Sequence, residues 1–161
     1  MNYFLSFGSN LGNRKENIRK SYNFMKQKRM DVLKISSIYE TQPVDFIEQP
    51  WFFNQVAKIQ TEYKPVDFLS ILKQIEIKAG RKETFHKGPR IIDIDILLAD
   101  RLVIQTKKLK IPHPDLDKRK FVLIPLAEIA PDVVHPILNK TIMEILEDLD
   151  DKSVVKKVKN C

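Results

Sequence analysis

Two aspartates separated by one residue, Asp93 and Asp95, interrupt the apolar run of residues 91–98. Side chains alternate along a strand, so the two carboxylates share one face and the intervening isoleucines share the other, which faces the core. At a rise of about 3.3 Å per residue, the carboxylates are roughly 6–7 Å apart. Two such charges repel each other and lose hydration unless a cation neutralises them. Mg²⁺ prefers carboxylate oxygens, so the pair predicts a magnesium site.

A basic loop precedes this strand. Arg90 follows the tight turn expected at Gly88 and Pro89, where its guanidinium can hold a phosphate through two hydrogen bonds. The alternative is that the aspartates are solvated or form ion pairs with Arg90. The other basic residues of 81–87 and 107–119 are ordinary surface charges when taken singly. If they converge on the carboxylate pair, they predict a triphosphate site.

Two other motifs carry less chemistry. The segment GSNLGN at residues 8–13 joins an expected strand to an expected helix, but it lacks the Gly-Lys-Ser/Thr ending of a Walker A loop and the spacing of a Rossmann fingerprint. It therefore predicts a structural turn. The three histidines, His86, His113 and His135, have no regular spacing, which argues against a zinc site.

The elements that position these residues follow the order β-α-β-β-α-β. The expected strands are residues 3–7, 32–39, 53–62 and 91–98, and the expected helices are residues 13–28 and 65–79. Asn13 and Glu16 form a capping box, while Pro65 and Gly80 bracket the second helix. A hairpin of 102–104 with 109–111 and short helices at 121–129 and 141–149 follow. The fold class is α+β, with a ferredoxin-like core in which helices pack on an antiparallel sheet.

Composition limits the functional classes. The chain of 161 residues is expected to form a single domain, 1–161, and its formal net charge of +7 suggests an anionic partner. No apolar stretch approaches the roughly 20 residues that span a bilayer. The single cysteine, Cys161, excludes an internal disulfide framework and fits a cytoplasmic location. The lysine-rich residues 152–159 are interpreted as a solvated or frayed end.

Residues 86–97, HKGPRIIDIDIL, resemble the signature of the 6-hydroxymethyl-7,8-dihydropterin pyrophosphokinase family. The resemblance extends over nearly the whole chain, because further motifs fall in the family's order. These are GSNL at 8–11, SS at 36–37, YET at 39–41, Gln49-Pro50, Asn54, Glu76, Gly80-Arg81, Pro112-His113, Arg119, Phe121 and IAP at 129–131.

The resemblance implies that pyrophosphate passes from ATP to the hydroxymethyl group of the dihydropterin, with release of AMP. It assigns Asp93 and Asp95 to two Mg²⁺ ions, and it assigns catalysis to these aspartates together with Arg81 and Arg90. The implied pterin residues are Thr41, Val44, Phe52, Asn54 and Phe121. The implied ATP residues are Lys73, Glu76, Arg90, Ile96, Lys108, His113 and Arg119. The implied partners are small-molecule substrates, with neither nucleic acid nor membrane, and the implied state is a monomer.

The aromatic pair explains how such a pocket would hold a pterin. Phe52 and Phe121 would stack on the two faces of the ring, and Asn54 would hydrogen-bond its polar edge. The loops 40–52 and 81–89 would close over the substrates and exclude water.

The sequence departs from the family pattern at several positions. Phe52 stands where a tyrosine is usual, and the loop 81–88 is one residue shorter and lacks a tryptophan before Gly88. Lys73, Lys108 and Lys110 stand where Gln, Arg and Thr are expected, and Pro114 replaces an aromatic residue. These changes are expected to alter loop geometry and ATP affinity, and to leave the reaction unchanged.

Two alternatives use the same features differently. A basic ferredoxin-like domain can bind RNA through aromatic side chains on an open sheet, although here the central strand carries carboxylates. A magnesium-dependent phosphoesterase would use the aspartate pair without any pterin.

Overall fold

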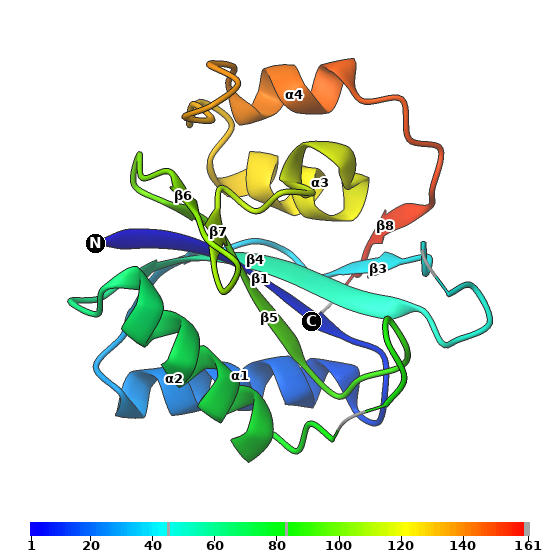
Figure 1. Ribbon diagram of the computed structural model, residues 1–161. Coiled ribbons are helices and arrows are strands. Elements are labelled where there is room, and N and C mark those ends of the chain that lie inside the picture. The colour runs from blue at the N-terminus through cyan, green and yellow to red at the C-terminus, as the bar shows by residue number, and fades with distance from the viewer. Residues whose placement is uncertain (45, 83, 160–161) are drawn as a thin grey trace.

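A single sheet lies between two layers of helices (Figure 1). The computed structural model describes residues 1–44, 46–82 and 84–159. The strands are β1 (Asn2–Ser9), β2 (Asp31–Ile35), β3 (Tyr39–Thr41), β4 (Phe52–Gln60), β5 (Asp93–Ala99), β6 (Ile104–Gln105), β7 (Lys110–Ile111) and β8 (Val155–Lys157). The helices are α1 (Arg14–Gln27), α2 (Pro65–Lys78), α3 (Lys120–Ile129) and α4 (Ile142–Asp148), with a 3₁₀ turn at Leu116–Lys118.

The strand order confirms the predicted α+β, ferredoxin-like core. The sheet runs β5-β1-β4-β3-β8, and β2 pairs with β4 next to β3. The strand pairs are antiparallel. In this order β1 and β4 lie at the centre of the sheet, and β5 forms one edge beside β1. The strand with the two aspartates was expected to be central, and it is instead at the border of this sheet.

The two helices of the core begin and end where the sequence indicates. The Asn13 side chain accepts a hydrogen bond from the Glu16 N–H at 3.1 Å, which caps α1. The capping box is only half formed, because the Glu16 carboxylate pairs with Arg19 instead of returning to Asn13. Pro65 occupies the first turn of α2, and Gly80 follows its end with φ +105°, a backbone angle that favours glycine.

The predicted strand 32–39 is two strands, because serines interrupt the ladder. The Ser36 hydroxyl accepts from the Val56 N–H at 3.0 Å, and the Ser37 N–H donates to the Glu128 carboxylate at 2.8 Å. In the segment that separates β2 from β3, these bonds replace the backbone hydrogen bonds of a continuous strand. The hairpin also differs in register, since Ile104 pairs with Ile111.

The C-terminal segment is part of the sheet, so a frayed end is the wrong interpretation of residues 152–159, whereas their lysines are exposed as a solvated surface requires. β8 pairs with β3 through residues 155–157, and the Val158 N–H donates to the Ile38 carbonyl at 2.8 Å. Cys161, the lone cysteine of the sequence prediction, lies outside the described residues.

Two apolar cores occupy the two faces of the sheet. α1 and α2 cover one face, over Leu5, Phe7 and Ile94, whereas α3 and α4 cover the other, over Phe4 and Val56 (Figure 1). An RNA-binding domain of the alternative type needs one open sheet face, so this arrangement argues against it. Within residues 1–44, 46–82 and 84–159, no helix combines the length and the hydropathy required to cross a membrane.

Candidate functional site

A cavity of about 370 Å³ opens on the sheet face that α3 covers. The predicted site residues that line it are Thr41, Val44, Phe52, Asn54, Arg90, Asp93, Asp95, His113, Arg119 and Phe121. Residues not predicted to form the site also line it: Ser6, Gly8, Gln42, Pro43, Gln49, Lys87, Leu97, Pro114, Asp115 and Val122. The cavity therefore joins the carboxylate pair to the aromatic pair.

β5 presents the two aspartates to this cavity. Its isoleucines at 94 and 96 are buried in the core under α1 and α2, and alternation turns Asp93 and Asp95 to the opposite face. Their cross-strand neighbours on β1, Gly8 and Ser6, are small and leave room above the carboxylates. Burial, followed by the charge of Asp93, raises the pKa of Asp95 to about 7, although Lys73 and Arg119 oppose the shift.

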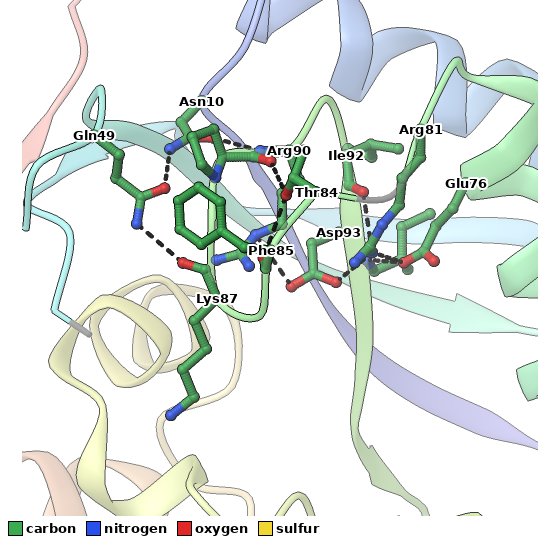
Figure 2. A network of polar contacts seen from close by, with 12 residues as sticks. Asn10, Gln49, Glu76, Arg81, Thr84, Phe85, Lys87, Arg90, Ile92 and Asp93 are labelled. Carbon is green, nitrogen blue, oxygen red and sulfur yellow. Dashed lines mark hydrogen bonds and ion pairs between the residues drawn. The ribbon is translucent and has the colours of Figure 1, made fainter. Parts of the chain in front are cut away.

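Arg81 lies between two carboxylates at the edge of this site (Figure 2). Its Nη1 is 2.9 Å from Asp93 Oδ1 and 3.2 Å from Glu76 Oε2. The same nitrogen donates to the Ile92 carbonyl at 3.3 Å. The guanidinium therefore neutralises the outer aspartate in this ligand-free arrangement.

Glu76 is a buried carboxylate, 3% exposed, that supports this arrangement from α2. It accepts a hydrogen bond from the Ile94 N–H at 2.7 Å, so it binds the outer edge of β5. Lys73 Nζ lies 3.6 Å from Glu76 Oε1. Burial raises the pKa of Glu76, while the bond from Ile94 and the charge of Lys73 lower it.

Two further arginines line the cavity. The Arg90 guanidinium lies over the Phe52 ring at 4.8 Å, and its Nε is 3.8 Å from Asp93 Oδ2. This buried Nε has no hydrogen-bond partner among the residues that the structure describes. Arg119 lies 5.6 Å from the Phe121 ring and pairs with Asp115 at 3.2 Å. Both cations are thus available to an anion placed beside the aspartates.

His113 is held by its backbone and by one ring nitrogen. Its N–H donates to the Leu97 carbonyl at 2.9 Å, and its Nδ1 accepts from the Asp115 N–H at 3.1 Å. Burial and the charge of Arg119 lower the pKa of His113. The ring is therefore neutral near pH 7, with its proton on Nε2, which can act as a donor.

The cavity also has an aromatic lining. Phe52 from β4 and Phe121 from α3 both line it. The buried Asn54 donates from Nδ2 to the Thr41 hydroxyl, which fixes the amide orientation. A Cβ added at Gly8 would lie 3.1 Å from Asn54 Oδ1, so glycine leaves the space that this amide needs.

A buried asparagine connects the loops around the cavity, a role that was not predicted from the sequence (Figure 2). Asn10 donates from Nδ2 to the Gln49 side chain and to the Pro50 carbonyl, both at 2.9 Å. Its Oδ1 accepts from the Arg90 N–H at 2.8 Å. Gln49 in turn donates to the Lys87 carbonyl at 3.1 Å. The segment 8–13, predicted as a structural turn, therefore joins the loops 41–51 and 81–90.

An aromatic contact adds to this connection. Phe46 and Phe85, from the two loops predicted to act as lids, meet edge to face with centroids 4.9 Å apart. The loops are therefore in contact with each other without any substrate bound.

Four of the predicted ATP residues are not among those that line the cavity: Lys73, Glu76, Ile96 and Lys108. The Ile96 side chain is 5% exposed and packs in the core under α1 and α2. Lys108 is exposed on the turn between β6 and β7. Lys73 is likewise exposed, on α2, but it contacts Glu76.

The carboxylate pair fits magnesium by its donor chemistry. Asp93 and Asp95 are hard oxygen donors on one wall of a cavity that also contains the Arg90 Nε, which has no hydrogen-bond partner among the described residues. Among the described residues, no cluster of three or more His, Cys, Asp or Glu side chains is suited to hold a metal. Mg²⁺ is commonly bound by one or two carboxylates, and water and substrate phosphates complete its shell.

Comparison with protein families and curated proteins gives a consistent result. Residues 4–131 match the family described as 7,8-dihydro-6-hydroxymethylpterin-pyrophosphokinase. A 2-amino-4-hydroxy-6-hydroxymethyldihydropteridine pyrophosphokinase of Aquifex aeolicus is 45% identical over 88% of this chain and 88% of its own length. A folic acid synthesis protein of Dictyostelium discoideum is 46% identical over 86% of this chain. The chain spans about a fifth of the length of this protein, 21%.

Solved structures agree on the fold. The wild-type HPPK-DHPS of Plasmodium falciparum with pteroate superposes with a TM-score of 0.73 at 17% identity, over 91% of this chain and 42% of that one. At this identity the likeness supports the fold alone.

Proposed function

The chain belongs to the 7,8-dihydro-6-hydroxymethylpterin-pyrophosphokinase family, and we propose that it transfers pyrophosphate from ATP to the hydroxymethyl group of 6-hydroxymethyl-7,8-dihydropterin. The products are the pterin diphosphate and AMP, in a step of folate biosynthesis. One observation carries this proposal: the Asp93–Asp95 carboxylates and the Phe52 and Phe121 rings line one and the same cavity. A flat heterocycle and a polyphosphate would meet there.

The phosphate end is built for charge neutralisation and not for covalent catalysis. Asp93 and Asp95 would hold the two Mg²⁺ ions expected here, which supply neutralisation of the phosphate charge when bound. Arg90 and Arg119 would contact phosphate oxygens, and the His113 Nε2–H would donate to the departing AMP side. Arg81 would exchange its pairing with Asp93 for the nucleotide, since the metal site needs that carboxylate.

The pterin end selects a flat, polar ring. Phe52 and Phe121 would stack on its two faces, and this contact uses ring area without needing the tyrosine hydroxyl that Phe52 lacks. Asn54 and Thr41 are paired with each other, so the free Asn54 Oδ1 faces the ring edge as an acceptor. Val44, at the start of the loop, would close the side of the pocket.

The nucleotide would extend along the border of the sheet. Ile96 lies on the edge strand β5 between the point where Glu76 accepts from Ile94 and the point where His113 donates to Leu97. Its side chain is in the core, so its contact with adenine would come through the backbone. Lys73, exposed on α2, and Lys108, exposed on the turn between β6 and β7, would reach the nucleotide from solvent.

The domain organisation, oligomeric state and partners are those expected of an enzyme that acts on small molecules. We propose that residues 1–161 act as one pyrophosphokinase domain, as a monomer in the cytoplasm, without nucleic acid or membrane partners. ATP is the co-substrate. The folic acid synthesis protein of Dictyostelium discoideum contains a region like this one within a longer chain. The proposal therefore allows a second enzyme of folate synthesis to be fused to this domain or to bind it.

The decisive experiment measures product formation. The protein is incubated with ATP, Mg²⁺ and 6-hydroxymethyl-7,8-dihydropterin, and AMP and the pterin diphosphate are quantified by chromatography. The variant Asp95→Ala should abolish turnover, because it removes a carboxylate from the phosphate end. Asp100→Ala is the matched control: Asp100 follows the same strand but is exposed, does not line the cavity, and accepts a hydrogen bond from the Asn2 N–H at 3.3 Å.

Three outcomes discriminate between the functions. AMP formation that requires the pterin, and that is lost in Asp95→Ala alone, supports the proposal. Phosphate release from ATP or a phosphoester without pterin would favour the phosphoesterase. Salt-dependent RNA binding without a metal requirement, and without AMP formation, would favour the RNA-binding domain.

A further inference from the structure

Arg14, the first residue of α1, contacts both ends of the loop that borders the pterin end of the cavity. Its Nη1 is 2.8 Å from the Glu40 carboxylate and donates to the Trp51 carbonyl at 2.9 Å. Its guanidinium lies 3.7 Å from the Phe53 ring centroid. One side chain thus touches Glu40 on β3, Phe53 on β4 and Trp51, the residue just before β4.

These contacts lie directly behind the pocket. In the β3–β4 pairing, Thr41 lies opposite Phe52, and Glu40 lies opposite Phe53. The first pair faces the cavity, so alternation turns the second pair to the other face of the sheet, where α1 packs. Arg14 therefore contacts the sheet on the face opposite the cavity, directly behind Thr41 and Phe52.

The position of Arg14 is unfavourable by local rules. A cation in the first turn of a helix opposes the positive end of the helix dipole. Glu16 is the acidic residue of that turn, and it pairs with Arg19 instead. Arg14 therefore does not stabilise its own helix through the dipole. The stabilisation that it provides must come from its contacts with the loop.

The contact is stronger than an ordinary surface ion pair. Exposed pairs contribute about 0–1 kcal/mol, and the Arg14 and Glu40 side chains are 27% and 37% exposed. Here the same guanidinium also satisfies a carbonyl and stacks on a ring, which fixes its orientation. It can hold the two ends of the loop at one separation and so lower the conformational entropy that substrate binding must remove.

We propose that Arg14 is a positioning residue for the pterin end of the site. It sets the base of the loop 42–50, which includes the cavity residues Pro43, Val44 and Gln49, and it touches no substrate itself. This inference rests on the proposed function for its kinetic consequence, but the bracing of the loop is a property of the substrate-free protein.

The test compares Arg14→Met with Arg19→Met, a matched variant on the same helix whose partner is the local Glu16. Arg14→Met keeps an unbranched apolar stem and removes the guanidinium with its hydrogen bonds. It should raise KM for the pterin about 3- to 10-fold, a loss expected for partly exposed charged bonds, and leave kcat and KM for ATP within about twofold. Arg19→Met should leave all three parameters unchanged.

A second variant guards against a mere folding defect. Arg14→Lys retains the charge and can pair with Glu40, but its ammonium cannot also stack flat on Phe53. It should give an intermediate KM for the pterin. A role limited to stability would lower the melting temperature of Arg14→Met without this graded change in KM.

Hydrogen exchange separates this inference from the proposed function. Without substrate, the amides of the described residues in 42–50 should exchange faster in Arg14→Met than in the wild type or Arg19→Met. If they do so while the wild type forms no AMP, the bracing role stands and the proposed function fails. If exchange and KM for the pterin are unchanged in an active enzyme, the positioning role is refuted.

Discussion

Replacing Asn10 by alanine should disconnect the loops that surround the cavity. The Asn10 side chain is 2% exposed and forms three hydrogen bonds, to Gln49, to Pro50 and from Arg90. Alanine cannot replace any of them. The Arg90 N–H and the Pro50 carbonyl would then lie without this partner at a partly buried junction.

The size of the effect follows from these groups. A buried polar group left unpaired costs about 1–3 kcal/mol, while Gln49 is partly exposed and can turn to water. We therefore expect Asn10→Ala to lower the free energy of unfolding by about 3 kcal/mol. For a chain of this size, that corresponds to a fall of roughly 6–12 °C in Tm. Because Gln49 also holds the Lys87 carbonyl, the loss extends to the loop 81–90.

Asn13→Ala provides the matched control. Asn13 is the same residue type three positions later, and its side chain caps α1 through the Glu16 N–H. Its loss should cost about 1 kcal/mol, without any contact with the loops. Steady-state kinetics and thermal unfolding of both variants separate the two effects: kcat/KM should fall about 10- to 100-fold in Asn10→Ala and stay within about twofold in Asn13→Ala.

Equal kinetics would refute this reasoning. If Asn10→Ala lowers Tm as expected but retains the kcat/KM of Asn13→Ala, then the junction stabilises the fold and does not position the loops. If neither Tm nor kinetics change, water replaces the amide at no cost.

Three further predictions concern charge and space. Asp95 has a pKa of about 7 in the metal-free protein, so Mg²⁺ must displace its proton below that pH, and calorimetry should show affinity falling about tenfold per pH unit below 7. Burial lowers the pKa of His135, and its Nδ1 accepts hydrogen bonds from two backbone N–H groups. The contribution of neutral His135 to the free energy of unfolding is therefore complete above about pH 6.5 and is lost as pH falls through the lowered pKa. His135→Asn keeps an acceptor that cannot titrate, and its Tm should fall less than that of the wild type between pH 7 and pH 5. Gly8→Ala should raise KM for the pterin several-fold with little change in Tm, since its Cβ crowds the amide of Asn54 at 3.1 Å.

For each of these three predictions, one experimental outcome would contradict the reasoning. Mg²⁺ affinity that does not vary between pH 6 and pH 8 would contradict the raised pKa of Asp95. Parallel acid curves for the wild type and His135→Asn would show that this ring does not govern acid stability. An unchanged KM in Gly8→Ala would mean that Asn54 moves aside without loss to the pocket.

Local patterns in the sequence predicted the features that short-range physics controls. The alternation around Asp93 and Asp95 placed both carboxylates on one face, and Asn13, Pro65 and Gly80 marked helix ends that the structure confirms. The resemblance to a known family supplied the residue roles, which stay predictions where the structure shows only position.

Features that depend on distant partners were missed. β8 has only a weak alternation of valine and lysine, and its partner β3 lies more than 100 residues earlier. The split of the strand 32–39 depends on where the Ser36 hydroxyl finds a distant N–H. Asn10 and Arg14 act through residues of other loops, so no spacing along the chain could reveal either of them.

The late position of β8 has a consequence for synthesis of the protein on the ribosome. Thr41 and its neighbours on β3 are made early, but their outer edge remains unpaired until residues 155–157 emerge. At about 5–20 residues per second, roughly 110 residues separate these events by several seconds or more. During that interval the nascent chain carries an open strand edge, the kind of surface on which chaperones and neighbouring chains act. The strand that carries the cavity residue Thr41 therefore gains its outer neighbour only when translation of this region is nearly complete.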